Sequence, residues 1–402
     1  KSGYSGPSGS SGTSGTSGTT VTAWNTITTD TTASANQGYL NNSTGDVIIT
    51  LPTDASVGNA VIITNINSGY SFVTPGTNWF INQFGTIMLE PFQSITLRAI
   101  TSSLWNIEAG NASSKALGLG AYSSTYRNWC VQFNLATLGI TTNFDQIKFV
   151  LSTARINTAA MSSKTRCVAG MGDSGSGTDL IEYVEFSTLS GMTNFGTATV
   201  SRRYAGGIAN TTRGIMAGGH VGYNIIEYIT IASTGNATDF GDLIETGQTI
   251  MTCGSSTRGI IGSGNVSSNM IEYITIASTG NASDFGDLLI TGYMGAALSS
   301  NTRGIFGGRY NGSDAVNIIE YITIASTGNS SDFGDLITKI YQEGTTSNLT
   351  RGVFIGGDNY NSYINTLQYI TIATTGNSLE FGRLDLMTYG TTGASCAHGG
   401  LY

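Results

Sequence analysis

Charged residues are scarce in this chain. Asp, Glu, Lys and Arg together make up 10% of its 402 residues, against roughly a quarter in ordinary soluble domains. The formal net charge is −8 and the basic residues form no cluster. This argues against a nucleic-acid surface, because phosphate binding needs concentrated positive charge. No apolar run approaches the roughly 18 residues of a membrane-spanning helix, so we expect no membrane insertion.

Cysteine and histidine are also few, and they fall into none of the common site patterns. The four cysteines form no CxxC pair and are Cys130, Cys167, Cys253 and Cys396. We expect them to be buried, small apolar side chains. Of the two histidines, we expect His220 in a loop and His398 in the last strand of the chain. The motifs HExxH, GxSxG and the phosphate-binding loop are absent, so we predict no enzyme, no cofactor and no metal site.

Proline is rare, and its four positions help to divide the chain into three regions. In residues 1–19, glycine recurs at every third position from Gly3 to Gly18. Only glycine fits the axis of a collagen triple helix, so these residues predict the end of a collagen-like stem. A flexible Gly/Ser linker is the alternative. Since the chain begins inside this repeat, we expect it to be part of a longer polypeptide.

Residues 20–112 contain the other three prolines and predict a small β domain. Five short apolar or alternating segments are separated by turn residues; they are 46–51, 60–66, 86–90, 94–100 and 104–109. The last segment, with Trp105, Asn106 and Ile107, resembles the small β modules that follow collagen-like stems in phage tail fibres. That resemblance implies a trimer, which would hold three stem chains together.

Residues 113–402 consist of a repeat of about 45 residues, the range of propellers and solenoids. The phrase IEYITIASTG occurs three times, and related versions begin at Cys130, Ile181 and Leu367. An arginine precedes each phrase in five copies, and Lys115 occupies its place in the first. The sequence therefore contains six units.

Each unit divides into four short strands, which in the fifth unit are 292–299, 303–308, 317–326 and 331–336. This order, with Gly-Gly at the end of the second strand, resembles kelch-type β-propellers. The resemblance implies an all-β, six-bladed propeller, with Phe240, Phe285, Phe333 and Phe381 in place of the usual fourth-strand Trp. The first unit lacks a first strand, and the last residues of the chain align with one. We therefore expect the C-terminal strand to close the ring in the first blade.

Charged residues recur at equivalent positions in the repeats. Arginine begins the second strand, glutamate lies in the third (Glu182, Glu227, Glu272, Glu320) and aspartate in the fourth (Asp239, Asp284, Asp332). We expect them to tie neighbouring strands together. Calcium binding by the turn that holds Asp239 and Asp242 is the alternative, but the turn lacks a dense set of oxygen ligands.

Sequence variation is concentrated on one face of the predicted ring. The turns between first and second strands, and between third and fourth, barely change in the central units. The loops between second and third strands differ in every unit and are rich in Tyr and Asn, which can stack on a sugar and hydrogen-bond to it. Random drift of surface loops is the alternative. The predicted receptor-binding residues are Tyr122, Tyr126, His220, Tyr223, Arg309, Tyr310, Asn311, Asp314, Asp358, Tyr360 and Tyr363.

Taken together, the regions 1–19, 20–112 and 113–402 resemble the distal part of a phage tail fibre, and the repeated phrase resembles repeats in structural proteins of cyanophages. The resemblance implies an extracellular virion protein, a homotrimer, that binds a host-surface glycan or protein receptor. Other virion tail proteins would bind through chain that precedes Lys1. Two alternatives are a purely structural fibre or decoration protein and a polysaccharide-cleaving fibre head.

Overall fold

The computed structural model describes residues 23–57, 59–66, 71–74, 80–81, 87–89, 94–101, 104–110, 115–135, 146–186, 188, 191–220, 222–248 and 251–401. The predicted stem at 1–19 lies outside these residues. The described chain is almost entirely β-strand, with one short 3₁₀ helix, η1 (Gly399–Leu401). It contains no helix with the length and apolarity to cross a membrane. Two compact units, Lys1–Ser113 and Ser114–Tyr402, divide the chain, and each is described by itself.

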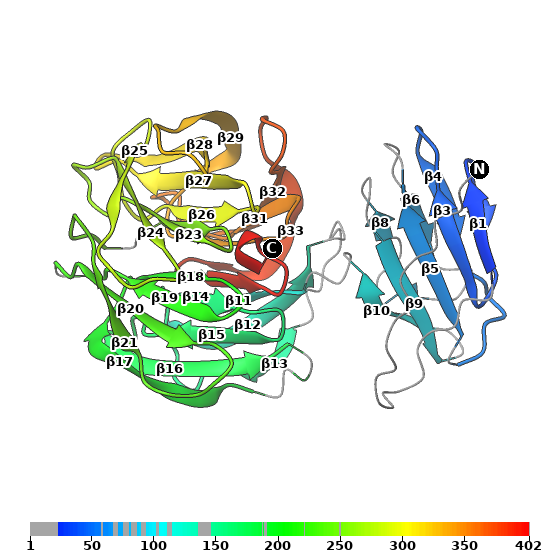
Figure 1. The fold of residues 1–402 in the computed structure, drawn as a ribbon, viewed down its shortest axis with the longest axis horizontal. Helices are drawn as coiled ribbons and strands as arrows, with labels where there is room; N and C mark the ends of the chain where they lie inside the picture. Colours follow the sequence, from blue (N-terminus) through cyan, green and yellow to red (C-terminus); the bar gives the residue numbers. More distant parts are fainter. Residues whose placement is uncertain are drawn as a thin grey trace, which may run out of the picture. The chain divides into compact units, whose positions relative to one another are not determined.

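The N-terminal unit has two sheets, and its first six strands alternate between them (Figure 1). The first sheet has the order β1 (Ala23–Ile27), β3 (Gln37–Asn41), β5 (Ala60–Asn65), β9 (Ser94–Thr101), β10 (Leu104–Gly110), β7 (Phe80–Ile81). The second has the order β2 (Thr31–Thr32), β4 (Val47–Thr50), β6 (Ser71–Thr74), β8 (Ile87–Leu89). The strands β1, β3 and β5 pair in parallel, as do β2, β4 and β6. All five predicted strand segments are confirmed, as β4, β5, β8, β9 and β10.

The parallel strands explain the apolar pattern of this unit. Val47 and Ile49 on β4 are buried, and so are Val61 and Ile63 on β5. Because strand side chains point alternately to opposite faces, each of these strands turns one face to the core. Trp105 on β10 is fully buried as well.

The C-terminal unit is a six-bladed β-propeller, as the sequence predicted (Figure 1). Every blade is a four-stranded antiparallel sheet. The innermost strands, in blade order, are β34 (Thr392–Ser395), β14 (Ala159–Ser162), β18 (Gly206–Ala209), β22 (Met251–Gly254), β26 (Ala296–Ser299) and β30 (Gly344–Ser347). The second strands are β11 (Lys115–Tyr122), β15 (Arg166–Gly170), β19 (Arg213–Ala217), β23 (Arg258–Gly262), β27 (Arg303–Tyr310) and β31 (Arg351–Ile355).

The third strands are β12 (Tyr126–Asn134), β16 (Thr178–Glu185), β20 (Ile225–Thr230), β24 (Met270–Thr275), β28 (Ala315–Thr323) and β32 (Ile364–Thr371). The outer strands are β13 (Gln146–Val150), β17 (Thr193–Arg202), β21 (Thr238–Asp242), β25 (Ser283–Asp287), β29 (Ser331–Ile340) and β33 (Leu379–Thr388).

The two ends of this unit meet in the first blade. The last strand, β34, pairs antiparallel with β11, from Ala116 opposite Ser395 to Leu119 opposite Thr392. The expected closure of the ring by the C-terminal strand is therefore present. The apolar core also runs around the whole ring. Each of its six clusters among the described residues contains side chains from two neighbouring blades.

A basic side chain at the start of each second strand holds the next blade. In the third blade, Arg213 Nη1 donates a hydrogen bond to the carbonyl oxygen of Ile276 in the fourth blade, at 2.8 Å. The sixth blade reaches the first in the same way, through Arg351 and Leu135. Equivalent pairs complete the circle: Lys115–Phe186, Arg166–Ile231, Arg258–Ile324 and Arg303–Ile372. Hydrogen bonds from charged donors are the stronger ones, worth about 1.5–3 kcal/mol each.

These guanidinium groups also stack on the tyrosine of the repeated phrase. Arg258 lies 4.4 Å above the Tyr273 ring, and this tyrosine meets the buried Phe285 edge to face, with ring centroids 6.0 Å apart. The blades from the second to the sixth share this Arg–Tyr–Phe order. The fourth-strand phenylalanines thus fill the space between the third and fourth strands.

The repeated glutamates tie each blade to the one before it. The carboxylate of Glu272 in the fourth blade accepts hydrogen bonds from the Ile244 and Glu245 amides at the end of the third. Glu182, Glu227 and Glu320 do the same, and Gln368 replaces them in the sixth blade. The prediction for these charges is thus correct for the arginines and glutamates. Of the fourth-strand aspartates, all exposed, Asp284 caps its own turn by accepting from Gly286 N.

The repeated turn after the third strand docks on the outer strand of the preceding blade. The amide of Gly280 donates to the carbonyl of Phe240 at 2.7 Å, and Asn281 Oδ1 accepts from Asp242 N at 3.0 Å. The approach requires a glycine: a Cβ on Gly241 would lie 2.4 Å from the oxygen of Gly280. Two parts of one phrase, the Gly-Asn turn and the Phe-Gly-Asp strand, are therefore complementary surfaces of neighbouring blades.

This docking predicts unequal effects for two glycines with similar backbones. Gly241 has φ 148° and Gly280 has φ 155°, but a Cβ on Gly280 would meet nothing within 4 Å. We expect Gly241→Ala to lower the free energy of unfolding by about 2 kcal/mol more than Gly280→Ala, because it forces two blades apart. Thermal and urea unfolding of both variants measure the difference. Equal losses would show that backbone conformation alone explains these glycines.

Candidate functional site

The loops between second and third strands, together with the linkers from each outer strand to the next innermost strand, form one face of the ring, called here the variable face. Because strands alternate in direction, the repeated turns all lie on the opposite, constant face. In five blades the linker has a residue with positive φ two positions before the innermost strand: Asn157, Tyr204, Met294, Gln342 and Gly390. This left-handed turn brings each linker to the rim of the central channel.

Four tyrosines gather where the fifth and sixth blades meet on this face, and we call them the Tyr310 cluster. The rings of Tyr310 and Tyr360 are stacked, with centroids 6.0 Å apart and an interplanar angle of 11°. Tyr293 and Tyr341, from two linkers, also contact Tyr310. Tyr360 is 60% exposed and has a φ of 75°, a conformation that non-glycine residues rarely adopt.

A hydrogen bond fixes this unusual backbone. The Asp358 carboxylate accepts from the amide of Tyr360 at 2.7 Å, an Asx turn that points the tyrosine outward. Asp358 also bonds to the hydroxyl of Tyr341, whose pKa is raised above its ordinary value by burial and then by this carboxylate. A large aromatic side chain is thus held in solvent by a strained but well-supported loop, which is a pattern found at functional sites.

A second group, the Tyr122 cluster, lies where the sixth and first blades meet. Tyr122 contacts Tyr126, Tyr363 and Tyr389, with ring centroids 5.1 to 6.1 Å apart. Tyr363 and Tyr389 also contact each other at 4.8 Å. The hydroxyls and ring edges of this cluster are partly exposed, since its members are half-buried.

The Tyr310 cluster, the Tyr122 cluster and a third, polar group form an arc around the variable face. The polar group lies in the second and third blades. Arg203 forms an ion pair with the nearly buried Asp173 at 3.4 Å. Tyr204 bonds to the same carboxylate, and burial followed by Asp173 raises its pKa above the ordinary value, so its hydroxyl remains a donor. His220 packs edge to face on Tyr204 and hydrogen-bonds to the side chain of Gln248.

Several predicted contact residues have other tasks in the structure. Arg309 is a correction: it is fully buried and pairs with Glu320, because β27 extends beyond the predicted strand and a bulge at Gly308 (φ 56°) turns Arg309 inward. Asn311 caps its own loop by accepting from Ser313 N and Asp314 N.

The other predicted residues lie on the variable face. Asp314 forms an exposed ion pair with Lys339 at 2.6 Å. Tyr223 is half-buried in the loop before β20. Of the predicted set, Tyr310 and Tyr360 come together in one cluster and Tyr122, Tyr126 and Tyr363 in the other.

The linker residues were missed by the sequence interpretation, which examined only the loops between second and third strands. Tyr293, Tyr341 and Tyr389 each stand three positions before an innermost strand. A tyrosine that recurs at this position could have indicated that the linkers also contribute aromatic side chains to the variable face. Glu343, two positions after Tyr341, had no equivalent in other repeats and gave no signal.

The central channel opens among these linkers. A cavity of about 100 Å³ at its variable-face end is lined by linker residues, including Asn157, Tyr204, Glu343 and Thr391, and by the first residues of the innermost strands. Glu343 is 6% exposed. Among the described residues, its two carboxyl oxygens, the Asn157 Nδ2 atom and the Thr391 hydroxyl have no hydrogen-bond partner.

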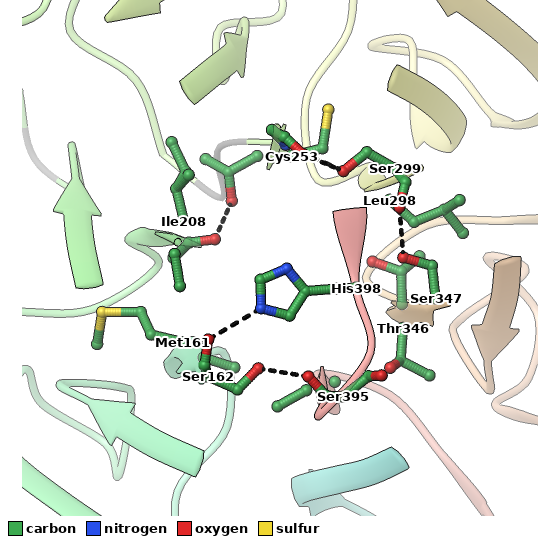
Figure 2. Close-up of a pocket in the computed structure, with 18 of the residues that line it drawn as sticks. Met161, Ser162, Ile208, Cys253, Leu298, Ser299, Thr346, Ser347, Ser395 and His398 are labelled. Atoms are coloured by element: carbon green, nitrogen blue, oxygen red, sulfur yellow. Dashed lines mark hydrogen bonds between the residues drawn. The ribbon is translucent and has the colours of Figure 1, made fainter. Parts of the chain in front are cut away.

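The channel continues into a second cavity of about 80 Å³, lined by Gly, Ala, Ser and Thr of the innermost strands (Figure 2). Hydroxyl groups join adjacent strands here: Ser162 donates to the carbonyl of Ser395, and Ser347 to that of Ser299, each at 2.8 Å. Small side chains let the innermost strands approach closely around the axis.

The end of the chain closes the channel at the constant face. His398 was expected in the last strand, but β34 ends at Ser395 and His398 projects into the channel (Figure 2). Its Nε2 donates to the Ser162 carbonyl at 2.9 Å and its Nδ1 accepts from Gly400 N at 3.2 Å. Burial lowers its pKa, so the imidazole is neutral. The short helix η1 follows and is buried.

Comparison with known proteins does not supply a function. No protein-family model matches the sequence, and no match was found among curated proteins. Within the described residues, no group of three His, Cys, Asp or Glu side chains is placed to hold a metal ion.

The buried carboxyl group predicts a pH dependence of stability. Burial raises the pKa of Glu343 from 4.5 to about 8, although the backbone amides of Glu343 and Ala296 and the charge of Arg309 lower it in part. Between these values the folded chain retains a proton that the unfolded chain has released, so stability falls as the pH rises through this interval. The loss is complete above about pH 8 and absent below pH 4.5.

Glu343→Gln removes this titration without a change of shape. We expect the variant to unfold at nearly the wild-type temperature below the interval and to be more stable, by a few kcal/mol at most, above it. Calorimetry of both proteins across the interval measures the difference. Parallel curves would mean that Glu343 has an ordinary pKa and is not desolvated.

Proposed function

We propose that the propeller is the receptor-binding head of an extracellular virion appendage, and that the variable face binds a host-surface glycan. The observation that carries this proposal is the Tyr310 cluster. Tyr360 exposes 60% of its surface on a backbone that costs energy to maintain, and it lies next to the polar residues Asp358 and Asn311. Aromatic faces beside hydrogen-bonding groups suit the alternating apolar and hydroxyl surfaces of a sugar.

The arc of aromatic and polar side chains supports the same proposal. It extends from the Tyr310 cluster through the Tyr122 cluster to Asp173, Arg203 and His220, so it spans the fifth, sixth, first, second and third blades. Such an extended, shallow surface fits a chain of sugar units better than a single small molecule.

The remaining regions complete the proposal. The Gly-X-Y repeat at 1–19 would form the end of a collagen-like stem, and the unit that precedes the propeller would hold three chains together. Three heads on one stem raise the effective concentration of the second and third contacts, so weak binding by each head becomes firm attachment. Other tail proteins would be the partners at the base of the stem.

The test uses the full chain on an array of bacterial surface polysaccharides. Tyr360→Ala and Tyr310→Ala should each weaken binding about tenfold, because a lost aromatic contact is worth about 0.5–1.5 kcal/mol per head and three heads multiply the loss. Tyr360→Phe should keep most of the affinity. Leu379→Ala is the matched control, since Leu379 is similarly exposed, at 58%, but begins an outer strand at the constant face.

Three outcomes would count against this function. Absence of binding to any polysaccharide favours a purely structural fibre. Release of reducing ends from the bound polymer favours a cleaving head. Equal effects of Tyr360→Ala and Leu379→Ala would remove the variable face from the site.

A further inference from the structure

The cavity at the channel mouth has the features of a pocket. Three side chains that are more than nine-tenths buried line it: Glu343 at 6% exposed, Asn157 at 7% and Thr391 at 4%. Among the described residues, no hydrogen bond reaches Asn157 Nδ2 or the Thr391 hydroxyl, and the Glu343 carboxyl group has only the backbone amides of Glu343 and Ala296 near it, outside hydrogen-bond geometry. Buried polar groups without partners destabilise the folded state. A fold otherwise tied together by many hydrogen bonds leaves three such groups around one space.

The pocket can be entered from one direction. Its lining begins with linker residues of the variable face, and Tyr204, which lines the cavity, belongs to the aromatic arc of that face. In the other direction His398 projects into the channel (Figure 2), and the buried η1 follows it in the chain. A ligand that lies along the arc can therefore extend one group into the channel.

The chemistry of the three side chains selects an uncharged group. The amide Nδ2 of Asn157 is a donor, and the Thr391 hydroxyl both donates and accepts. A cation would satisfy a carboxylate but cannot accept from Asn157. An anion can only accept, so it leaves the Glu343 oxygen that does not carry the proton without a donor. A hydroxyl group both donates and accepts, so it satisfies all three.

Two further observations agree with a neutral ligand. The positive charge of Arg309 lies near Glu343 and opposes a bound cation, although Arg309 is itself paired with Glu320. Burial keeps Glu343 protonated near neutral pH, and a carboxylic acid can donate one hydrogen bond while it accepts another.

The volume limits how much of a ligand can enter. About 100 Å³ is well below the roughly 300–1,000 Å³ of pockets that enclose a whole drug-sized ligand. It admits a hydroxymethyl group or a pair of adjacent hydroxyl-bearing carbons, while the rest of a sugar ring would remain outside, near Tyr204.

We propose that the channel mouth is a subsite for the hydroxyl-bearing end of an uncharged terminal sugar, bound by Glu343, Asn157 and Thr391. This subsite rests on the proposed glycan-binding function and defines its ligand: the glycan ends in a neutral unit, and binding includes a chain end rather than only the middle of a polymer.

The experiment titrates the full chain with methyl glucoside, methyl galactoside, methyl mannoside and N-acetylglucosamine, followed by saturation-transfer NMR and binding isotherms. Glu343→Leu and Thr391→Val should each weaken the best of these sugars about tenfold, since each removes hydrogen bonds without loss of volume. Glu343→Gln should stay within about twofold, because an amide donates and accepts like a protonated acid. The matched control is Thr388→Val, which removes another buried, unpartnered hydroxyl outside the cavity.

The possible failures are distinguishable. If polysaccharide binding persists and depends on Tyr360 while Glu343→Leu and Thr391→Val leave the sugars unaffected, the subsite is wrong and the glycan-binding face stands. If sodium or methylammonium binds and Glu343→Gln abolishes that binding, the pocket is a cation site. If crystals soaked in the sugars hold only water in the cavity, the subsite is also overturned. If no polysaccharide binds at all, the proposed function itself fails.

Discussion

The propeller depends on a circle of hydrogen bonds in which a basic side chain of each blade holds a carbonyl oxygen of the next. Lys115, Arg166, Arg213, Arg258, Arg303 and Arg351 complete this circle. A contact of this kind requires the donor and the acceptor turn to recur in every repeat. The near-identity of the repeated phrase is therefore a consequence of the ring, because each copy must match both its neighbours.

The same constraint explains why variation is confined to one face. The turns of the constant face are inter-blade contacts, so a change in one of them disturbs two blades. The loops of the variable face are supported from below by buried ion pairs, such as Arg155–Glu182 at 2.7 Å and Arg202–Glu227. Because these ion pairs support the loops, the loop sequences of the variable face can differ in each blade without weakening the contacts between blades.

Much of this architecture was accessible from the sequence. Repetition of one phrase gives the number of blades, and the missing first strand of the first unit gives the closure. Tyr310 and Tyr360, chosen from the pattern of loop variation, do lie together, while their part in binding stays a prediction. Two features could not be predicted from the repeat pattern. One is the bulge at Gly308, which buries Arg309, and the other is the position of His398 in the central channel. The desolvation of Glu343 depends on residues from several blades, so no single repeat could reveal it. The parallel strands of the N-terminal unit were missed because β1 and β3 are short and polar.

Closure by β34 also orders events during synthesis. Blades two to six each use a continuous piece of chain, so each sheet can form as soon as its four strands have left the ribosome. Blade one cannot, because β11 is made before the other five blades and its partner β34 is made after them. While those blades are translated one edge of β11 has no neighbour, and such an edge is a template for strands of other nascent chains. Synthesis of β34 thus ends the period in which this edge is exposed to misassembly, and His398, which follows β34, enters the axis directly afterwards.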